Sequence, residues 1–80
     1  MDVKQEFLFS FPKNDKEAIR FSIREFKGQV YFEARLFFKS DKGEWLPTKK
    51  GLTLSIGHYG EFRKGVQKIG EQVSVLDKAA

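Results

Sequence analysis

The strongest constraint on the fold is residues 19–39, where apolar and polar side chains alternate twice around a glycine turn. Apolar residues occupy positions 19, 21 and 23 before Lys27-Gly28, and positions 30, 32 and 34 after it. Period-two alternation is typical of half-buried strands, and glycine tolerates the positive φ that a tight turn needs. The stretch therefore predicts a β-hairpin with one apolar face and one face carrying Arg20, Arg24 and Arg35.

The remaining segments complete a small sheet and add a helix. Residues 5–11 place three phenylalanines at alternate positions up to Pro12, which is expected to end that strand. Residues 44–54 return to an extended pattern, which Pro47 and Gly51 mark as irregular or as an edge strand. Ser55 is a favourable N-cap for the amphipathic stripe that follows it. We predict an α+β fold in one domain over residues 1–80: a four-stranded curved antiparallel sheet (about 5–54), then a C-terminal helix (about 55–76), ββββα.

The size of the chain predicts oligomerisation. The chain has 80 residues and no cysteine, and a domain this small buries only about 60–65% of its unfolded surface. Disulfides are excluded, and the helical stripe is longer than four short strands can cover. A second copy is therefore expected to meet it, giving a homodimer. The predicted dimer interface consists of Tyr59, Phe62, Val66, Ile69 and Val73.

Positive charge and aromatic rings gather in the middle of the chain. Residues 18–51 hold eight of the 15 basic, four of the 11 acidic and seven of the 12 aromatic residues, and the net charge is +4. A single strand of nucleic acid needs cations for its phosphates and flat side chains for its bases. The pattern therefore favours nucleic acid as partner. The candidate cations are Arg20, Arg24, Lys27, Arg35, Lys49 and Lys50, and the candidate platforms are Phe26, Trp45 and either Phe37 or Phe38.

No residue pattern predicts catalysis. His58 is the only histidine, and neither a metal-ligand spacing nor a phosphate-binding glycine loop occurs. We therefore expect no enzyme activity, catalytic residue, cofactor, metal or small-molecule substrate. No stretch approaches the roughly 20 apolar residues of a membrane helix, and no targeting segment is visible. A cytoplasmic protein is expected, nucleoid-associated if bacterial, with no membrane partner.

Two segments resemble the positive cofactor four family, transcriptional coactivators with a single-stranded-DNA-binding domain. Residues 19–30, with the turn Arg24-Glu25-Phe26-Lys27-Gly28, are similar to its first hairpin, and Lys49-Lys50-Gly51 with the following residues is similar to its basic segment before the helix. The resemblance spans roughly residues 18–70. It implies the ββββα fold, a homodimer and single strands held across the curved sheet.

The resemblance also implies roles for individual residues. Arg24, Phe26 and Lys27 match DNA-contacting residues of the hairpin. Arg35 matches a basic strand position, Phe38 replaces a stacking tryptophan, and Lys49 and Lys50 match a basic pair.

Three departures from the family pattern have consequences. Gln29 and Leu46 replace lysines, and Thr48 replaces a glycine. Two lost cations predict a weaker salt dependence, because each neutralised phosphate contributes about −0.7 to the log–log slope. The serine-rich region of eukaryotic members is absent, which favours a minimal, bacterial-type member.

The predicted function is a homodimeric, largely sequence-independent single-stranded-DNA-binding protein, acting in transcription regulation or other DNA transactions. An RNA-binding module and a protein–protein adaptor remain alternatives. The same aromatic platforms accept RNA, and only a contact to the 2′-hydroxyl distinguishes the two.

Overall fold

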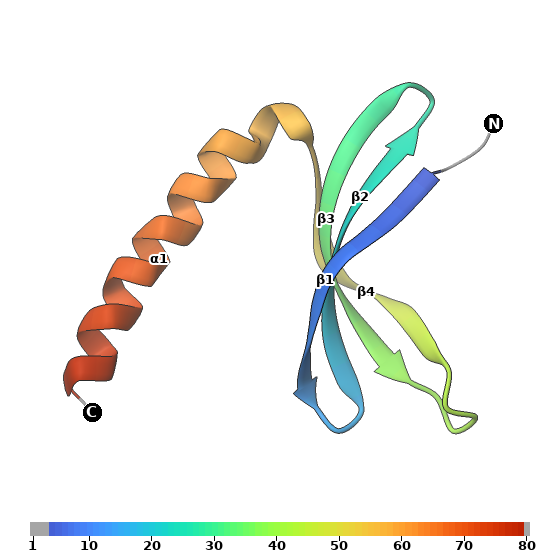
Figure 1. Cartoon of the computed structure of the whole chain (residues 1–80), viewed down its shortest axis with the longest axis horizontal. Coiled ribbons are helices and arrows are strands. Elements are labelled where there is room, and N and C mark those ends of the chain that lie inside the picture. The colour runs from blue at the N-terminus through green and yellow to red at the C-terminus, as the bar shows by residue number, and fades with distance from the viewer. Residues whose placement is uncertain (1–3, 80) are drawn as a thin grey trace.

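The computed structural model describes residues 4–79, which form four strands and a C-terminal helix. The elements are β1 (Lys4–Asn14), β2 (Glu17–Phe26), β3 (Gln29–Lys39), β4 (Trp45–Ser55), a 3₁₀ turn (Ile56–His58) and α1 (Tyr59–Ala79). The strands pair antiparallel in the order β1-β2-β3-β4, so β1 and β4 are the edges of one twisted sheet (Figure 1). The predicted α+β class and the ββββα order are confirmed.

Strand register divides the sheet into two chemically different faces, because alternate side chains point to opposite sides. Arg20 pairs with Arg35, and Ser22 pairs with Glu33, which pairs in turn with Thr53. We call the side that these residues share the polar face; it comprises Arg20, Ser22, Arg24, Glu33, Arg35 and Thr53. The opposite side, the apolar face, comprises Phe9, Phe21, Ile23, Phe32, Leu52 and Leu54. The hairpin thus has the two faces that its alternation predicts.

Strand β1 departs from simple alternation. Phe7 pairs with Ser22 but Phe9 pairs with Phe21, so the register shifts at Leu8. This bulge sends Phe7 to the polar face, while Phe9 lies on the apolar face with its ring 6.0 Å from that of Phe21. Pro12 does not end the strand as expected, because β1 is an edge strand, where proline is tolerated. The strand continues to Asn14.

The helix begins later than the sequence predicts. Ser55 makes no side-chain capping bond, and it pairs with Tyr31 as the last residue of β4. The sheet therefore keeps Ser55 in an extended conformation, and the chain makes a 3₁₀ turn before α1 starts at Tyr59. Where the sequence predicts a helix over about 55–76, the structure thus has a 3₁₀ turn over Ile56–His58 and an α-helix over Tyr59–Ala79.

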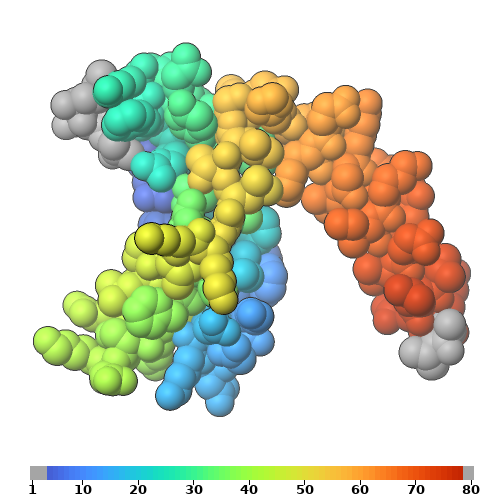
Figure 2. All heavy atoms as spheres, turned by 180° about the vertical axis from the view of Figure 1, so that it is seen from behind, coloured from blue at the N-terminus to red at the C-terminus, as the bar shows by residue number. Residues whose placement is uncertain are grey.

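Only the beginning of α1 touches the sheet. The ring of Phe32 lies 5.6 Å from that of Tyr59 and 5.3 Å from that of Phe62. Farther along, the helix stands apart from the strands, as Figure 1 and the view from behind in Figure 2 show. The buried apolar residues of the described chain are accordingly few: Ala18, Leu36 and Phe37. No helix within residues 4–79 is long and apolar enough to cross a membrane.

Candidate nucleic-acid interface

The tip of the β2–β3 hairpin presents an aromatic ring and a cation together. Lys27 and Gly28 have φ values of +52° and +79°, the pair of positive angles that a type I′ turn requires. Such angles suit glycine and asparagine, so a lysine here is uncommon. The Lys27 ammonium lies 5.2 Å from the centroid of the Phe26 ring, which is 39% exposed. The turn therefore offers both a stacking surface and a phosphate partner to solvent.

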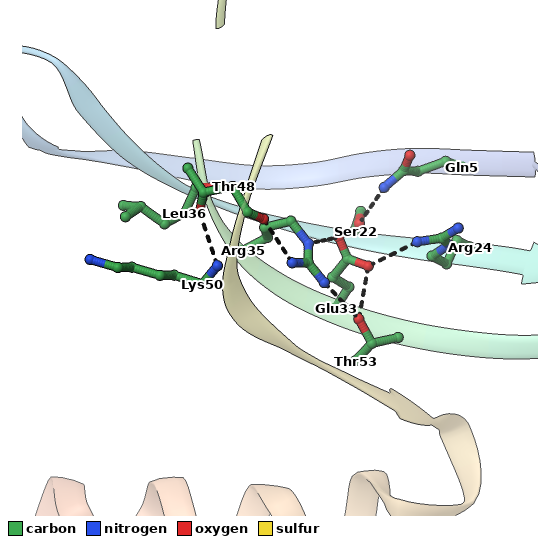
Figure 3. A network of polar contacts seen from close by, with 9 residues as sticks. All are labelled: Gln5, Ser22, Arg24, Glu33, Arg35, Leu36, Thr48, Lys50 and Thr53. Atoms are coloured by element: carbon green, nitrogen blue, oxygen red, sulfur yellow. Dashed lines mark hydrogen bonds and ion pairs between the residues drawn. The ribbon is translucent and has the colours of Figure 1, made fainter. Parts of the chain in front are cut away.

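A buried carboxylate occupies the centre of the polar face. Glu33 is only 4% exposed and accepts hydrogen bonds from Arg35 Nε at 2.8 Å, Thr53 Oγ1 at 2.9 Å and Arg24 Nη1 at 3.2 Å (Figure 3). Burial by itself raises the pKa of Glu33, but the bonds from Arg35, Thr53 and Arg24 outweigh it. The net pKa is therefore below the ordinary 4.5. Glu33 stays ionised at neutral pH and holds two arginines in place.

The two arginines differ in how much of the guanidinium these bonds use. Arg35 also donates from Nη1 to the Thr48 carbonyl at 2.9 Å and from Nη2 to Thr53 Oγ1 at 3.1 Å. Its side chain is 21% exposed, against 34% for Arg24. Arg24 thus combines one bond to Glu33 with a larger solvent-facing surface.

The other end of the polar face is aromatic. The Arg20 guanidinium carbon lies 4.6 Å from the ring centroid of Phe37, 5.5 Å from that of Phe7 and 5.9 Å from that of Trp45. Three rings thus surround one cation. Each cation–π contact of this kind contributes about 0.5–1 kcal/mol at an exposed site. Trp45 is half-buried, and Arg20 covers part of the surface it was predicted to offer to a base.

The basic pair Lys49 and Lys50 lies on the exposed edge of the sheet. Both lysines are exposed, within a bulge of β4 that ends at Gly51. A Cβ added at Gly51 would lie 2.7 Å from the carbonyl oxygen of Ala34, so only glycine allows this close approach of β4 to β3. The glycine after the two lysines therefore has a packing reason.

Phe38 stands apart from the other candidates. It pairs with Glu17 and with Leu46, whereas Phe37 beside it contacts Arg20, so Phe38 lies on the opposite side of the sheet. Its ring is 39% exposed. A hydrogen bond from Asn14, then the charge of Lys13 and more weakly that of Lys50, lowers the pKa of the neighbouring Glu17.

The structure thus groups the predicted residues unequally. Arg20, Arg24, Arg35 and Trp45 share the polar face, Phe26 and Lys27 form its tip, Lys49 and Lys50 border it, and Phe38 lies behind it. Phe7, Glu33, Thr48 and Thr53 complete the arrangement and were not predicted. Glu33 could have been predicted, because it is an acidic residue on the strand face that carries the arginines. Within residues 4–79, no group of three or more acidic, histidine or cysteine side chains is placed to hold a metal ion.

Comparison with known proteins gives one consistent answer. The model of the family Transcriptional Coactivator p15 (PC4) matches residues 13–65. The RNA polymerase II transcriptional coactivators KIWI and KELP of Arabidopsis thaliana are 33% and 34% identical over 57 and 58 residues, which is 71% and 72% of this chain. The chain spans 52% of the length of KIWI and 34% of that of KELP.

Solved structures share the fold at lower identity. A PC4 homolog from Burkholderia pseudomallei superimposes with a TM-score of 0.77 at 21% identity, covering 84% of this chain and 98% of that one. A bacteriophage T5 homolog of the coactivator PC4, implicated in recombination-dependent DNA replication, gives a TM-score of 0.67 at 22% identity. That match covers 99% of this chain and 89% of the phage chain.

Proposed function

The chain belongs to the Transcriptional Coactivator p15 (PC4) family, and on that premise we propose that it is a homodimeric, largely sequence-independent single-stranded-DNA-binding protein. The family match confirms the resemblance seen in the hairpin and in the basic segment. The proposed action is binding without catalysis, in transcription or in other DNA transactions that expose single strands.

The observation that carries the proposal is the placement of exposed rings and cations around the polar face. Phe26 and Lys27 project at the hairpin tip, and Lys49 and Lys50 project at the edge strand. From Arg20 to Phe26 an extended strand covers about 20 Å, room for several nucleotides. Base stacking on a ring contributes roughly 1–3 kcal/mol per base irrespective of sequence, and cations along the path neutralise phosphates.

Exposed apolar surface supports the dimer. Tyr59, Val66, Ile69 and Val73 are each about half exposed or more, although they form one stripe along α1. A groove of about 610 Å³ lies between the apolar face and the start of α1, lined in part by Phe21, Phe32 and Phe62. Phe9, whose ring lies 6.0 Å from that of Phe21, is 63% exposed. Contiguous apolar surface of this kind marks an interaction site, and a second copy offers a matching helix and sheet.

A fluorescence-anisotropy titration with labelled oligo-dT of about 20 nucleotides tests the proposal. The wild type should bind, resist duplex competitor and weaken as salt rises. Phe26→Ala should weaken binding at least about fivefold through lost stacking. Lys49→Ala/Lys50→Ala should reduce the steepness of the log–log salt slope by about 1.4 for each subunit whose sheet contacts the strand. Lys64→Ala is the matched control, because Lys64 lies on α1 and pairs with Glu61.

Four outcomes would contradict the proposal or redirect it. No binding at low salt rejects it, and unchanged affinity in both variants rejects the site. RNA of the same sequence competing equally well would extend the ligand to any single strand. Binding without salt dependence would favour a protein partner, for which the aromatic residues would be the contact surface.

A further inference from the structure

The bulge that carries the two lysines has an unusual construction. Arg35 pairs with Gly51 and Phe37 pairs with Pro47, so the three residues 48–50 of β4 lie opposite the single residue Leu36 of β3. A bulge of this kind interrupts the ladder of backbone hydrogen bonds and re-aims side chains. Unless other bonds replace that ladder, the backbone beneath the lysines has no fixed conformation.

The Thr48 hydroxyl supplies the first replacement. It donates to the Leu36 carbonyl at 2.8 Å and accepts from the Lys50 backbone N–H at 3.1 Å. One side chain therefore ties the bulge both to β3 and to the bulge's own far end. A glycine at this position would carry no hydroxyl and could make neither bond.

The Arg35 guanidinium supplies the second replacement. Its Nη1 donates to the Thr48 carbonyl at 2.9 Å, while Nε and Nη2 are held by Glu33 and Thr53 (Figure 3). All three nitrogens of the group are engaged within the protein. The same figure shows the Lys50 side chain extending away from this network. Arg35 thus acts on the backbone that presents the lysines.

We propose that Thr48 and Arg35 are positioning residues that fix the bulge and so hold the ammonium groups of Lys49 and Lys50 ready for the phosphates of a single strand. The inference rests on the proposed function. A backbone that is ordered before binding lowers the entropy that the complex loses. Arg35, on this view, strengthens binding without touching DNA.

The first test removes the hydroxyl and restores it. Thr48→Val keeps the branched shape without the hydroxyl, and it should weaken oligo-dT binding about two- to tenfold, the size expected for a lost hydrogen bond. Thr48→Ser keeps the hydroxyl and should bind within about twofold of wild type. Ser40→Ala is the control, since Ser40 accepts from the backbone of Lys42 and Glu44 in a turn away from the bulge. Its affinity should match the wild type.

The second test asks whether the effect passes through the lysines. Arg35→Gln and Thr48→Val are each measured in the wild type and in the Lys49→Ala/Lys50→Ala background. Residues that act through a shared partner give non-additive effects. Both changes should therefore weaken binding in the wild type and have little further effect without the lysines. If Arg35→Gln loses the same factor in both backgrounds, Arg35 contacts the DNA itself and its positioning role is overturned.

A third measurement needs no DNA. Amide hydrogen exchange at Lys50 should be faster in Thr48→Val than in the wild type or Thr48→Ser, because the N–H loses its acceptor. An unchanged exchange rate at Lys50 would show that the Thr48 hydroxyl does not fix the bulge. If the wild type binds and Thr48→Val binds equally well, the inference fails while the proposed function stands. A wild type that does not bind overturns both. Circular dichroism of each variant confirms that the fold is retained.

Discussion

At the scale of single residues, the positively charged side chains differ in their surroundings. Arg20 is packed among three rings, Arg35 is bonded on every nitrogen, and Lys49 and Lys50 point to solvent. A guanidinium has five donors in a fixed fork, which suits a defined network, whereas an ammonium on a flexible stem suits a mobile phosphate. Arg24 lies between these cases, since it bonds Glu33 and remains one-third exposed.

Lys27 has a backbone conformation that costs stability, and we propose that its charge contributes to DNA binding. Its φ of +52° lies in the left-handed region, which costs most residues roughly 1–2 kcal/mol and asparagine less. Lys27→Asn should therefore raise the free energy of unfolding by about 1 kcal/mol. The same change should weaken oligo-dT binding and reduce the steepness of the salt slope by about 0.7 for each subunit whose hairpin contacts the strand. Thermal denaturation and anisotropy titration measure the two effects.

Lys27→Arg keeps the charge in the same strained turn and is the control. It should bind nearly as tightly as the wild type without gaining stability. An asparagine variant that is more stable and binds equally well would show that the Lys27 charge takes no part in binding.

At the scale of elements, the sequence predicts where strands exist better than how they are paired. The hairpin is predictable because residues 19–24 and residues 30–35 alternate on either side of Lys27-Gly28. The bulges at Leu8 and at residues 48–50 are not, because each depends on the register against a neighbouring strand. Ser55 carries a good capping signal, yet pairing with Tyr31 overrides it. The candidate site follows the same division. The exposed lysines can be predicted from the sequence, whereas the hydrogen bonds of Glu33 and Thr48 depend on how the strands pair.

The network that joins β2, β3 and β4 should make stability depend on pH. The pKa of Glu33 is lowered by folding, so the stabilisation is complete above the ordinary value of 4.5 and is lost as the pH falls through the lower folded value. Glu33→Gln should cost about 1–3 kcal/mol at pH 7, because Arg24 and Arg35 lose an ionised acceptor. Below pH 4.5 the two stability curves should converge. Urea unfolding at pH 7, 5 and 3 measures this.

Glu71→Gln provides the matched comparison, because Glu71 is an exposed residue of α1 that pairs loosely with Lys68. Its stability curve should run parallel to that of the wild type. If the wild type and Glu33→Gln lose stability equally between pH 5 and pH 3, the network does not supply the acid sensitivity.

At the scale of the whole molecule, the sheet and the helix do not form a closed core by themselves. The described residues bury only three apolar side chains to below about a tenth of their surface, and α1 leaves the sheet after Phe62. Folding entropy of order 1 kcal/mol per residue demands more apolar burial than this. The missing burial is available if the stripe of α1 covers the apolar face of a second copy. Folding and dimerisation should then be one equilibrium.

Ile69→Asp tests that coupling. Ile69 is 65% exposed in a single copy, where such a surface change would alter stability by no more than about 0.5 kcal/mol. In a dimer it would bury an unpaired charge, so the variant should sediment as a monomer and melt well below the wild type. The wild-type melting temperature should rise with protein concentration, because association stabilises the folded state by mass action.

Gln67→Asp introduces the same side chain on the other side of α1 and should leave both the sedimentation and the melting temperature unchanged. A wild type that sediments as a monomer, or a dimeric Ile69→Asp, would contradict the shared interface. If the wild type is a monomer, its affinity for oligo-dT has to come from one sheet. The salt slope of a monomer should reflect the cations of one copy only. A dimer that holds one strand across both sheets should show a slope about twice as steep as that of a single sheet.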